Sequence, residues 1–211
     1  MYGQLRTDIR LVAAGTTEHA TVTELFQCLP PGVSVKNVFK VSRPVESDMF
    51  AYDVAPHRLL LHGTHARNAL GILQRGILLP KVAFIDYVHG WYQAHMSDVQ
   101  VVTTLFNVER SDYGMLGAGA YFSPEPRVAC AYCKSSPGFS TRVVFVAKVA
   151  IGRMYNTDTE LPSTVEPPPG FDSVCGSPAT PQHPTPFKKG LEVRICGALQ
   201  WRWCCGVCER M

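Results

Sequence analysis

The sequence predicts a single α+β domain over residues 1–211, with short strands and few helices. Three observations lead to this prediction. Residues 16–29 carry apolar side chains at helical spacing, residues 143–149 form a strong strand pattern, and 17 glycines with 16 prolines make the chain rich in turns. A hydrophobic content of 46% and a charged content of 18% fit a globular chain and argue against disorder.

The first part of the chain predicts a helix, two strands and a second helix. Thr16 or Thr17 can cap the first helix, which lies in an N-terminal helical segment of residues 1–33. Thr64 can cap the second helix, and Gly76 can close it. The expected elements are a helix within 16–29, strands at 35–41 and 59–64, and a helix from 64 to 76.

Residues 80–116 show no clean period but contain several aromatic side chains, so we expect a long ordered loop there. A glycine-rich turn then runs into a strand at 117–122, and residues 157–190 are rich in turns and prolines. The remaining expected elements are a short helix at 127–134, the strand at 143–149 and a strand-like stretch at 191–203.

Charge and hydropathy exclude several classes of protein. With 20 basic and 17 acidic side chains the formal net charge is +3, which is too small to indicate nucleic-acid or anionic-membrane binding. No signal peptide is visible, and the longest apolar run, 143–151, is interrupted by Lys148 and too short to cross a bilayer. We therefore expect a soluble intracellular protein, cytoplasmic or nuclear, with no membrane partner and with reduced thiols.

The cysteines are unevenly placed. Cys130 and Cys133 have the spacing of metal ligands but form a single pair, and three more cysteines crowd a Cys-rich tail at 204–211. A tetrahedral ligand set is not evident in either place. We therefore predict no metal and expect most of the thiols to be packing residues.

Two short segments can carry chemistry. At His62-Gly63-Thr64 a strand end, a glycine and a helix start place free backbone N–H groups beside an imidazole and a hydroxyl, although a surface histidine at a helix cap is the simpler interpretation. At 117–122 two glycines allow a ligand to approach the backbone, and Tyr121 can offer an aromatic face. A tight hairpin with a core tyrosine is the alternative there, and the dinucleotide-binding fingerprint is incomplete.

Taken together and in order, five segments resemble the catalytic domain of the poly(ADP-ribose) polymerase family. They are Val38–Val41 with Arg43, Leu60–Gly76 with its His-Gly-Thr, Gly117–Cys133, Val149–Tyr155 and Pro169–Val174. The resemblance covers roughly residues 17–203. The family's catalytic glutamate usually stands eight residues before a glutamine, as Glu192 stands before Gln200, although the residues after Glu192 depart from the usual aromatic-rich pattern.

The resemblance implies an ADP-ribosyltransferase fold, a split β-sandwich of two packed antiparallel sheets with a few short helices. It implies transfer of ADP-ribose from NAD⁺ to a macromolecular acceptor, with release of nicotinamide. It also implies a catalytic triad and a substrate-binding set, which are His62, Tyr121 and Glu192 for catalysis and His62, Gly63, Thr64, Asn68, Tyr121 and Tyr132 for NAD⁺. Residues 80–116 correspond to a donor-side loop insertion and residues 157–190 to an acceptor-side loop.

Two positions depart from the family pattern. Ala129 stands where the family usually has a serine that binds the nicotinamide carboxamide, and losing one neutral hydrogen bond costs about 0.5–1.5 kcal/mol. Leu78 stands where some members carry an adenosine-contacting arginine. We therefore expect weaker NAD⁺ binding, unless Ser123 replaces the missing hydroxyl.

Several functions stay open on the sequence alone. The short segment between Val174 and Glu192 favours transfer of single units or short chains over synthesis of long poly(ADP-ribose). A catalytically weak NAD⁺- or ADP-ribose-binding module on the same fold is a second alternative. A nucleic-acid-binding module would rest on the net charge alone. We expect a monomer whose acceptor is a protein, itself included, with nucleic acid left open as an acceptor.

Overall fold

The computed structural model describes residues 7–29, 31–44, 48, 50–77, 114–134, 141–177, 192–195 and 203–210. Residues 78–113 lie outside the described part of the chain, and they include most of the predicted donor-side loop (80–116). Residues 178–191, which include the end of the predicted acceptor-side loop (157–190), also lie outside it. The strands are β1 (Asp8–Leu11), β2 (Val33–Ser42), β3 (His57–Gly63), β4 (Ala120–Phe122), β5 (Thr141–Ala150), β6 (Met154–Thr157), β7 (Ser173–Gly176), β8 (Glu192–Ile195) and β9 (Trp203–Arg210). The helical segments are α1 (Thr17–Glu24), η2 (Ala66–Asn68), α3 (Ala69–Arg75) and α6 (Pro126–Tyr132).

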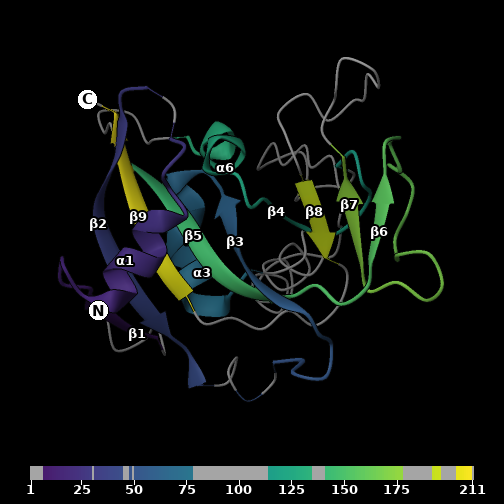
Figure 1. Cartoon of the computed structure of the whole chain (residues 1–211), viewed down its shortest axis with the longest axis horizontal. Coiled ribbons are helices and arrows are strands. Elements are labelled where there is room, and N and C mark those ends of the chain that lie inside the picture. The colour runs from purple at the N-terminus through teal and green to yellow at the C-terminus, as the bar shows by residue number, and fades with distance from the viewer. Residues whose placement is uncertain are drawn as a thin grey trace, which may run out of the picture.

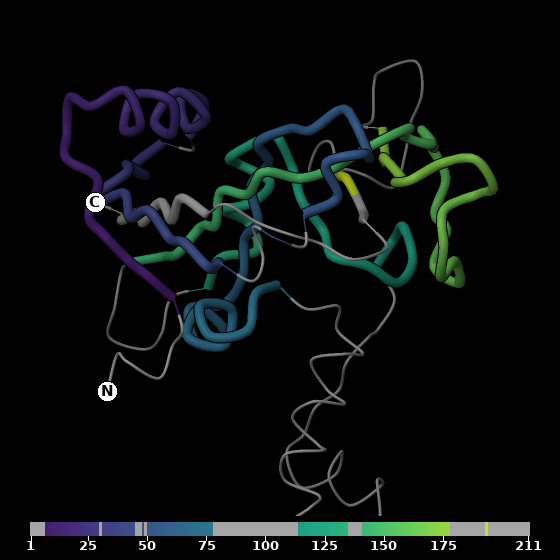
Figure 2. Tube along the Cα trace, turned by 90° about the horizontal axis from the view of Figure 1, so that it is seen from below, coloured from purple at the N-terminus to yellow at the C-terminus, as the bar shows by residue number. Residues whose placement is uncertain are grey.

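The strands form two sheets. A five-stranded antiparallel sheet has the order β1-β2-β9-β5-β3, and a four-stranded sheet has the order β4-β8-β7-β6. The sheets lie side by side, with β1, β2 and α1 at one end of the molecule and β6 and β7 at the other (Figures 1 and 2). The α+β prediction is confirmed.

The expectation of two wholly antiparallel sheets is wrong in one place. β6 and β7 pair in parallel, with Met154 opposite Ser173 and Thr157 opposite Gly176. A parallel pair needs a connection that returns the chain to the same end of the sheet. Residues 158–172 provide that connection, so the segment predicted as a loop also sets the direction of β7.

Residues 203–210, which include most of the expected cysteine-rich tail (204–211), form a central strand. β9 pairs with β2 on one side and β5 on the other, so that Cys205 stands opposite both Phe39 and Phe145. Gly206 stands opposite Val38 and Val144 in the same way. The two longest strands of the sheet, β2 and β5, therefore meet only through β9.

The helix ends follow the expected capping chemistry with one exception. The Thr16 side chain accepts a hydrogen bond from the amide of His19 at 3.2 Å and begins α1, which ends at Glu24 rather than near Leu29. Gly76 closes α3 with a φ of 87°, as predicted. Thr64 does not cap the second helical segment, because His65 takes that place and accepts from the amide of Arg67 at 3.2 Å.

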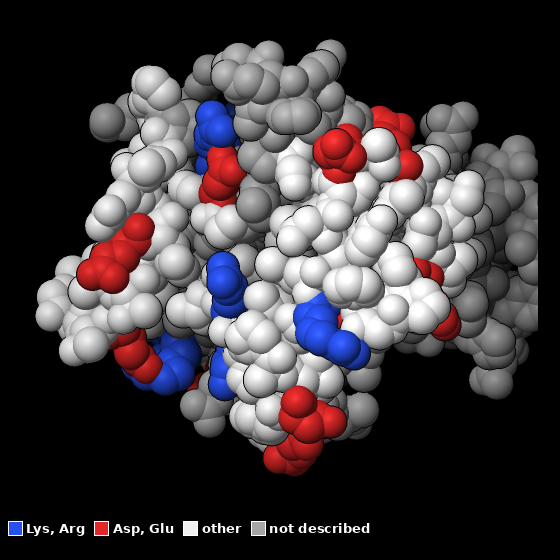
Figure 3. Space-filling view, turned by 45° about the vertical axis from the view of Figure 1, so that its right-hand side comes forward, with Lys and Arg blue, Asp and Glu red and all other residues white. Residues whose placement is uncertain are grey.

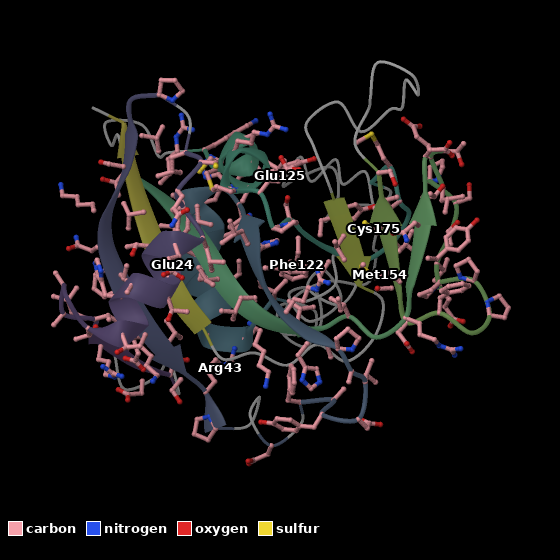
Figure 4. All side chains as sticks on the ribbon, viewed as in Figure 1. Glu24, Arg43, Phe122, Glu125, Met154 and Cys175 are labelled. Carbon is pink, nitrogen blue, oxygen red and sulfur yellow. The ribbon has the colours of Figure 1, made fainter. Side chains whose placement is uncertain are left out.

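The five-stranded sheet is buried on both faces at its centre, along β5. Along β5, Phe145 and Ala147 belong to one hydrophobic cluster, whereas Val144 and Val146 belong to another. The first cluster is shared with the four-stranded sheet through Phe122, Cys175 and Val193 (Figure 4 labels Phe122 and Cys175), and α3 packs against it. The second cluster lies under α1 and α6. A strand buried on both faces shows a continuous apolar run, which explains the pattern at 143–149.

A two-way backbone pairing joins the sheets. The amide of Leu61 in β3 donates to the carbonyl of Ser123 at 2.8 Å, and the amide of Ser123, which follows β4, donates to the carbonyl of Leu61 at 2.9 Å. This bridge joins β3, an edge strand of the larger sheet, to the residue that follows β4, an edge strand of the smaller sheet.

The buried cysteines in α6 and directly after it are packing residues. Cys130 and Cys133 are both buried in the second cluster, and the Cys133 thiol donates to the carbonyl of Val143 at 3.2 Å. Burial raises the pKa of Cys133 to about 12, so this thiol stays protonated. Among the described residues no group of three or more His, Cys, Asp or Glu side chains is placed to hold a metal ion. No helix in the described part of the chain is long and apolar enough to cross a membrane.

Two leucines that differ in burial provide a test of the core packing. Leu61 is 1% exposed and Leu70, on α3, is 63% exposed. We expect Leu61→Ala to lower the free energy of unfolding by about 3–5 kcal/mol, because it opens a cavity in a packed core. The matched variant Leu70→Ala is expected to change it by less than about 0.5 kcal/mol. Urea denaturation measures both, and similar losses in the two variants would contradict the packing described.

Candidate functional site

The three residues predicted for catalysis come from three strands linked by backbone hydrogen bonds. His62 follows Leu61, the residue of β3 that pairs with Ser123. Tyr121 is the middle residue of β4, and Glu192 is the first residue of β8, which pairs with β4. In Figure 1 the ends of β3 and β4 lie next to one another, with β8 beside β4. The topology therefore brings sequence-distant positions to one junction.

His62 is fixed by the backbone of Tyr121. Its Nδ1 lies 2.8 Å from the carbonyl oxygen of Tyr121, and its ring packs 5.5 Å from that of Phe122. A carbonyl oxygen only accepts, so Nδ1 carries the proton and Nε2 of the neutral ring keeps a free lone pair. Burial lowers the pKa of His62, and the hydrogen bond to Tyr121 opposes that shift more weakly. The ring is therefore neutral at pH 7 and can accept a hydrogen bond through Nε2.

Gly63 leaves space for α6. A Cβ at this position would stand 1.8 Å from the carbonyl oxygen of Ala129 and 2.6 Å from its carbonyl carbon. These are backbone atoms of a helix, which cannot move aside like the end of a flexible side chain. A residue without a side chain is therefore required where α6 packs against the end of β3.

The edge of β3 also gives Gly63 a polar role. In an antiparallel strand the N–H and C=O groups of alternate residues face the same edge. Leu61 directs both groups to Ser123, away from β5, and the β3–β5 register shows no irregularity as far as Gly63. The backbone donor and acceptor of Gly63 therefore face the same outer edge as those of Leu61, beside α6.

Thr64 and Asn68 are brought together. The Asn68 side-chain amide donates to Thr64 Oγ1 at 2.9 Å. The amide of Ala66, between them, donates to the carbonyl of Lys134 at 3.0 Å, which ties this segment to the residues that follow α6. Tyr132 is the last residue of α6 and is 40% exposed. The predicted binding residues after β3 therefore lie near the end of the helix that carries Tyr132.

Tyr121 is anchored by a turn whose role sequence reasoning missed. Its hydroxyl donates to the carbonyl of Gly117 at 2.6 Å and accepts from the amide of Leu116 at 3.1 Å. Its side chain packs with buried Leu116 and Val174, whereas its neighbours Ala120 and Phe122 belong to the core shared by the sheets. The alternative of a core tyrosine is thus partly correct, since Tyr121 is half-buried. Gly117, four residues before Tyr121, was the only sequence signal for this contact.

Glu192 is placed through the backbone of β8. It stands opposite Gly176 of β7, and the next residue, Val193, stands opposite both Cys175 of β7 and Phe122 of β4. Val193 is buried in the core shared by the sheets. Glu192 is therefore adjacent in sequence to Val193, the residue that pairs with Phe122. The ring of Phe122 in turn packs against His62.

No family model matches the sequence. Over 156 residues, or 74% of its length, the chain is 35% identical to protein mono-ADP-ribosyltransferase PARP4 of Mus musculus, of which it covers 7%. It is 24% identical over 191 residues to protein mono-ADP-ribosyltransferase PARP3 of Homo sapiens, with 87% of this chain and 30% of that protein covered. With poly [ADP-ribose] polymerase 1 of Xenopus laevis it shares 23% over 194 residues, covering 87% of this chain and 17% of that protein.

The chain is a homologue of PARP family members. The family resemblance predicted from the motifs is thereby confirmed over most of the sequence. The chain spans less than a third of the length of each of these curated PARP relatives.

Of the two departures from the PARP motifs, Ala129 and Leu78, the structure describes Ala129. It also describes Ser123, the expected replacement for the missing hydroxyl. Ala129 is 2% exposed, and its carbonyl lies against Gly63. Ser123 is also 2% exposed, and its hydroxyl accepts a hydrogen bond from the amide of Glu125 at 3.0 Å at the turn before α6. The Ser123 hydroxyl therefore helps to shape the start of α6. Leu78 lies outside the described residues.

The contact between Gly63 and α6 gives a matched pair of glycine substitutions. We expect Gly63→Ala to lower the free energy of unfolding by about 3 kcal/mol, since overpacking against backbone forces α6 away from β3. Gly71 lies within α3, and a Cβ there meets nothing within 4 Å. Gly71→Ala is expected to stabilise the protein by about 0.5–1 kcal/mol, because glycine weakens a helix interior. Urea denaturation measures the change in the free energy of unfolding for both variants. No change in Gly63→Ala would refute the contact.

The partly buried imidazole of His62 predicts a pH dependence. Because burial lowers its pKa below the usual 6.5, the unfolded chain binds the proton more readily than the folded one. The contribution to stability is therefore complete above about pH 6.5 and is lost as pH falls through the lower folded pKa. We expect the NMR titration of His62 to give a pKa below 6.5. We also expect His62→Asn to remove this part of the pH dependence of unfolding, and a pKa at or above 6.5 would contradict the assignment.

Proposed function

We propose that this chain is an ADP-ribosyltransferase domain that takes NAD⁺ as its substrate, releases nicotinamide and transfers single units or short chains of ADP-ribose to a macromolecular acceptor. One observation carries the proposal. In a homologue of PARP proteins, His62, Tyr121 and Glu192 belong to strands that the Leu61–Ser123 bridge and the β4–β8 pairing join at one place. We further propose that the two sheets, which share a core, form the split β-sandwich of that fold.

Cleavage of NAD⁺ needs a held ribose and a stabilised positive charge. The bond to nicotinamide breaks through a transition state with oxocarbenium character at the ribose carbon, as in glycoside hydrolysis. We assign the Glu192 carboxylate to accept a hydrogen bond from the ribose 2′-hydroxyl and to stabilise this charge. We assign His62 to hold a ribose hydroxyl, and its neutral Nε2 acceptor supports that role.

The nicotinamide end is assigned to Gly63 and two tyrosines. The outward-facing N–H and C=O of Gly63 supply the donor and the acceptor that a carboxamide needs. Tyr121 and Tyr132 flank the ring in this proposal. Because the Tyr121 hydroxyl is already bonded to the turn at 116–117, its contribution is the ring face rather than a proton. Thr64 and Asn68, which bond to each other, are assigned to the adenosine side.

Ala129 lowers the affinity in this proposal. Without the serine hydroxyl the carboxamide loses one neutral hydrogen bond, which corresponds to about 0.5–1.5 kcal/mol, or several-fold in the dissociation constant. The Gly63 backbone contacts remain.

The acceptor is proposed to be a protein, including the chain itself, and the enzyme is proposed to act as a monomer. Some relatives are named mono-ADP-ribosyltransferases and others are named polymerases, so their names alone do not decide chain length. The alternative of a nucleic-acid-binding module has no support on the face shown in Figure 3, where basic and acidic side chains are interspersed.

Labelled NAD⁺ tests the proposed chemistry. We expect the wild-type protein to release nicotinamide and to label itself or an added acceptor. We expect Glu192→Gln to lower both rates by at least about 100-fold, because a neutral amide no longer stabilises the developing charge. Glu160→Gln, which changes an exposed carboxylate in the connection after β6, serves as the matched control and should retain activity.

Three outcomes of this experiment contradict parts of the proposal. Equal labelling by the wild type and Glu192→Gln would remove Glu192 from the mechanism. A ladder that extends to long products on a denaturing gel would replace single-unit or short-chain transfer with polymer synthesis. Binding of NAD⁺ without any release of nicotinamide would favour the alternative of a binding module.

A further inference from the structure

The Tyr121 hydroxyl is hydrogen-bonded to one turn, and a second turn holds that turn in place. The inner turn, residues 114–118, supplies the Gly117 carbonyl and the Leu116 amide that bond Tyr121 Oη at 2.6 and 3.1 Å. The outer turn, residues 161–164, follows β6 and belongs to the segment expected on the acceptor side.

Two backbone hydrogen bonds join the turns. The amide of Leu161 donates to the carbonyl of Met115 at 2.7 Å, and the amide of Ala118 donates to the carbonyl of Thr164 at 2.9 Å. A further bond within the outer turn, from the amide of Thr164 to the carbonyl of Leu161 at 3.1 Å, fixes the spacing between these two contacts. The inner turn is therefore held at both ends.

The fit between the turns leaves no space at Gly117. A Cβ there would stand 2.1 Å from the carbonyl oxygen of Thr164 and 2.9 Å from that of Leu161. The φ of Gly117 is 90°, a left-handed conformation that favours glycine. Both the backbone angle and the contact distance therefore require glycine at the point where the turns touch.

An apolar cluster completes this unit. Leu116 and Val174 are fully buried, and Tyr121, Tyr155 and Leu161 pack against them. The cluster thus contains side chains from both turns and from β4, β6 and β7. Displacing the outer turn would remove packing from the Tyr121 ring as well as the hydrogen bonds of the inner turn.

We propose that the outer turn positions Tyr121 through the inner turn, which makes Leu161 and Thr164 positioning residues of the nicotinamide site. The inference rests on the proposed function, because it assumes that the Tyr121 ring stacks on the substrate. A ring fixed before binding loses less freedom when the substrate arrives, so affinity rises. The acceptor-side segment consequently takes part in shaping the donor side.

Two variants and one control test this proposal. Tyr121→Phe keeps the ring but leaves the buried Leu116 amide and Gly117 carbonyl without the hydroxyl. Gly117→Ala pushes directly on the outer turn. Gly15→Ala is the matched control, because Gly15 has a φ of 85° and a Cβ there meets nothing within 4 Å. All three are compared with the wild-type protein by hydrogen exchange and by the kinetics of NAD⁺ turnover.

We expect both test variants to speed amide exchange in the inner and the outer turn by about tenfold. Tyr121→Phe takes the hydroxyl away from two buried backbone groups, and Gly117→Ala overpacks the contact between the turns. In Tyr121→Phe we expect KM for NAD⁺ to rise several-fold while kcat stays within about twofold, since the lost preorganisation affects ground state and transition state alike. Gly15→Ala should leave both turns and KM unchanged.

Faster exchange confined to the inner turn would overturn the proposal, because the turns would then be independent. Coupled exchange with an unchanged KM would overturn it as well, because the outer turn would not act on the donor site. A wild-type protein that releases no nicotinamide would refute the proposed function alone, since the exchange comparison still decides whether the outer turn holds Tyr121.

Discussion

The pairing of Leu61 with Ser123 is the constraint on which the rest of this structure depends. It joins the edge of the larger sheet to the smaller sheet through two short backbone hydrogen bonds. Because strand residues alternate, the bridge places His62 where its ring reaches the carbonyl of Tyr121, and it turns the backbone groups of Gly63 toward the outer edge. The proposed site is therefore a direct result of how two sheets meet.

Packing around this junction explains residues that could be taken for purely functional ones. Gly63 is needed because the backbone of α6 lies where its side chain would be. Tyr121 is half in the core, and its hydroxyl bonds to the preceding turn. Such residues serve folding and the proposed chemistry together, so their substitution changes stability and activity at once. Separating the two effects requires matched controls at positions with the same backbone geometry.

Local patterns predicted much of the fold, whereas long-range pairings did not emerge from them. The apolar run at 143–149 was sufficient for β5, whose central residues are buried on both faces. The capping threonine was sufficient for the start of α1, although its end at Glu24 was not predicted. The parallel pairing of β6 with β7 depends on the path of residues 158–172, which has no local period. Within the site, family motifs predicted His62 and Tyr121. The partners of the Tyr121 hydroxyl depend on a turn whose geometry no motif encodes.

The position of β9 bears on how the protein is made. This strand follows all the other described strands in sequence, yet it lies between β2 and β5 in space. During vectorial synthesis β2 leaves the ribosome long before its partner exists, so its hydrogen-bonding edge stays open while the intervening chain is translated. The larger sheet is therefore completed only after β9 has been translated.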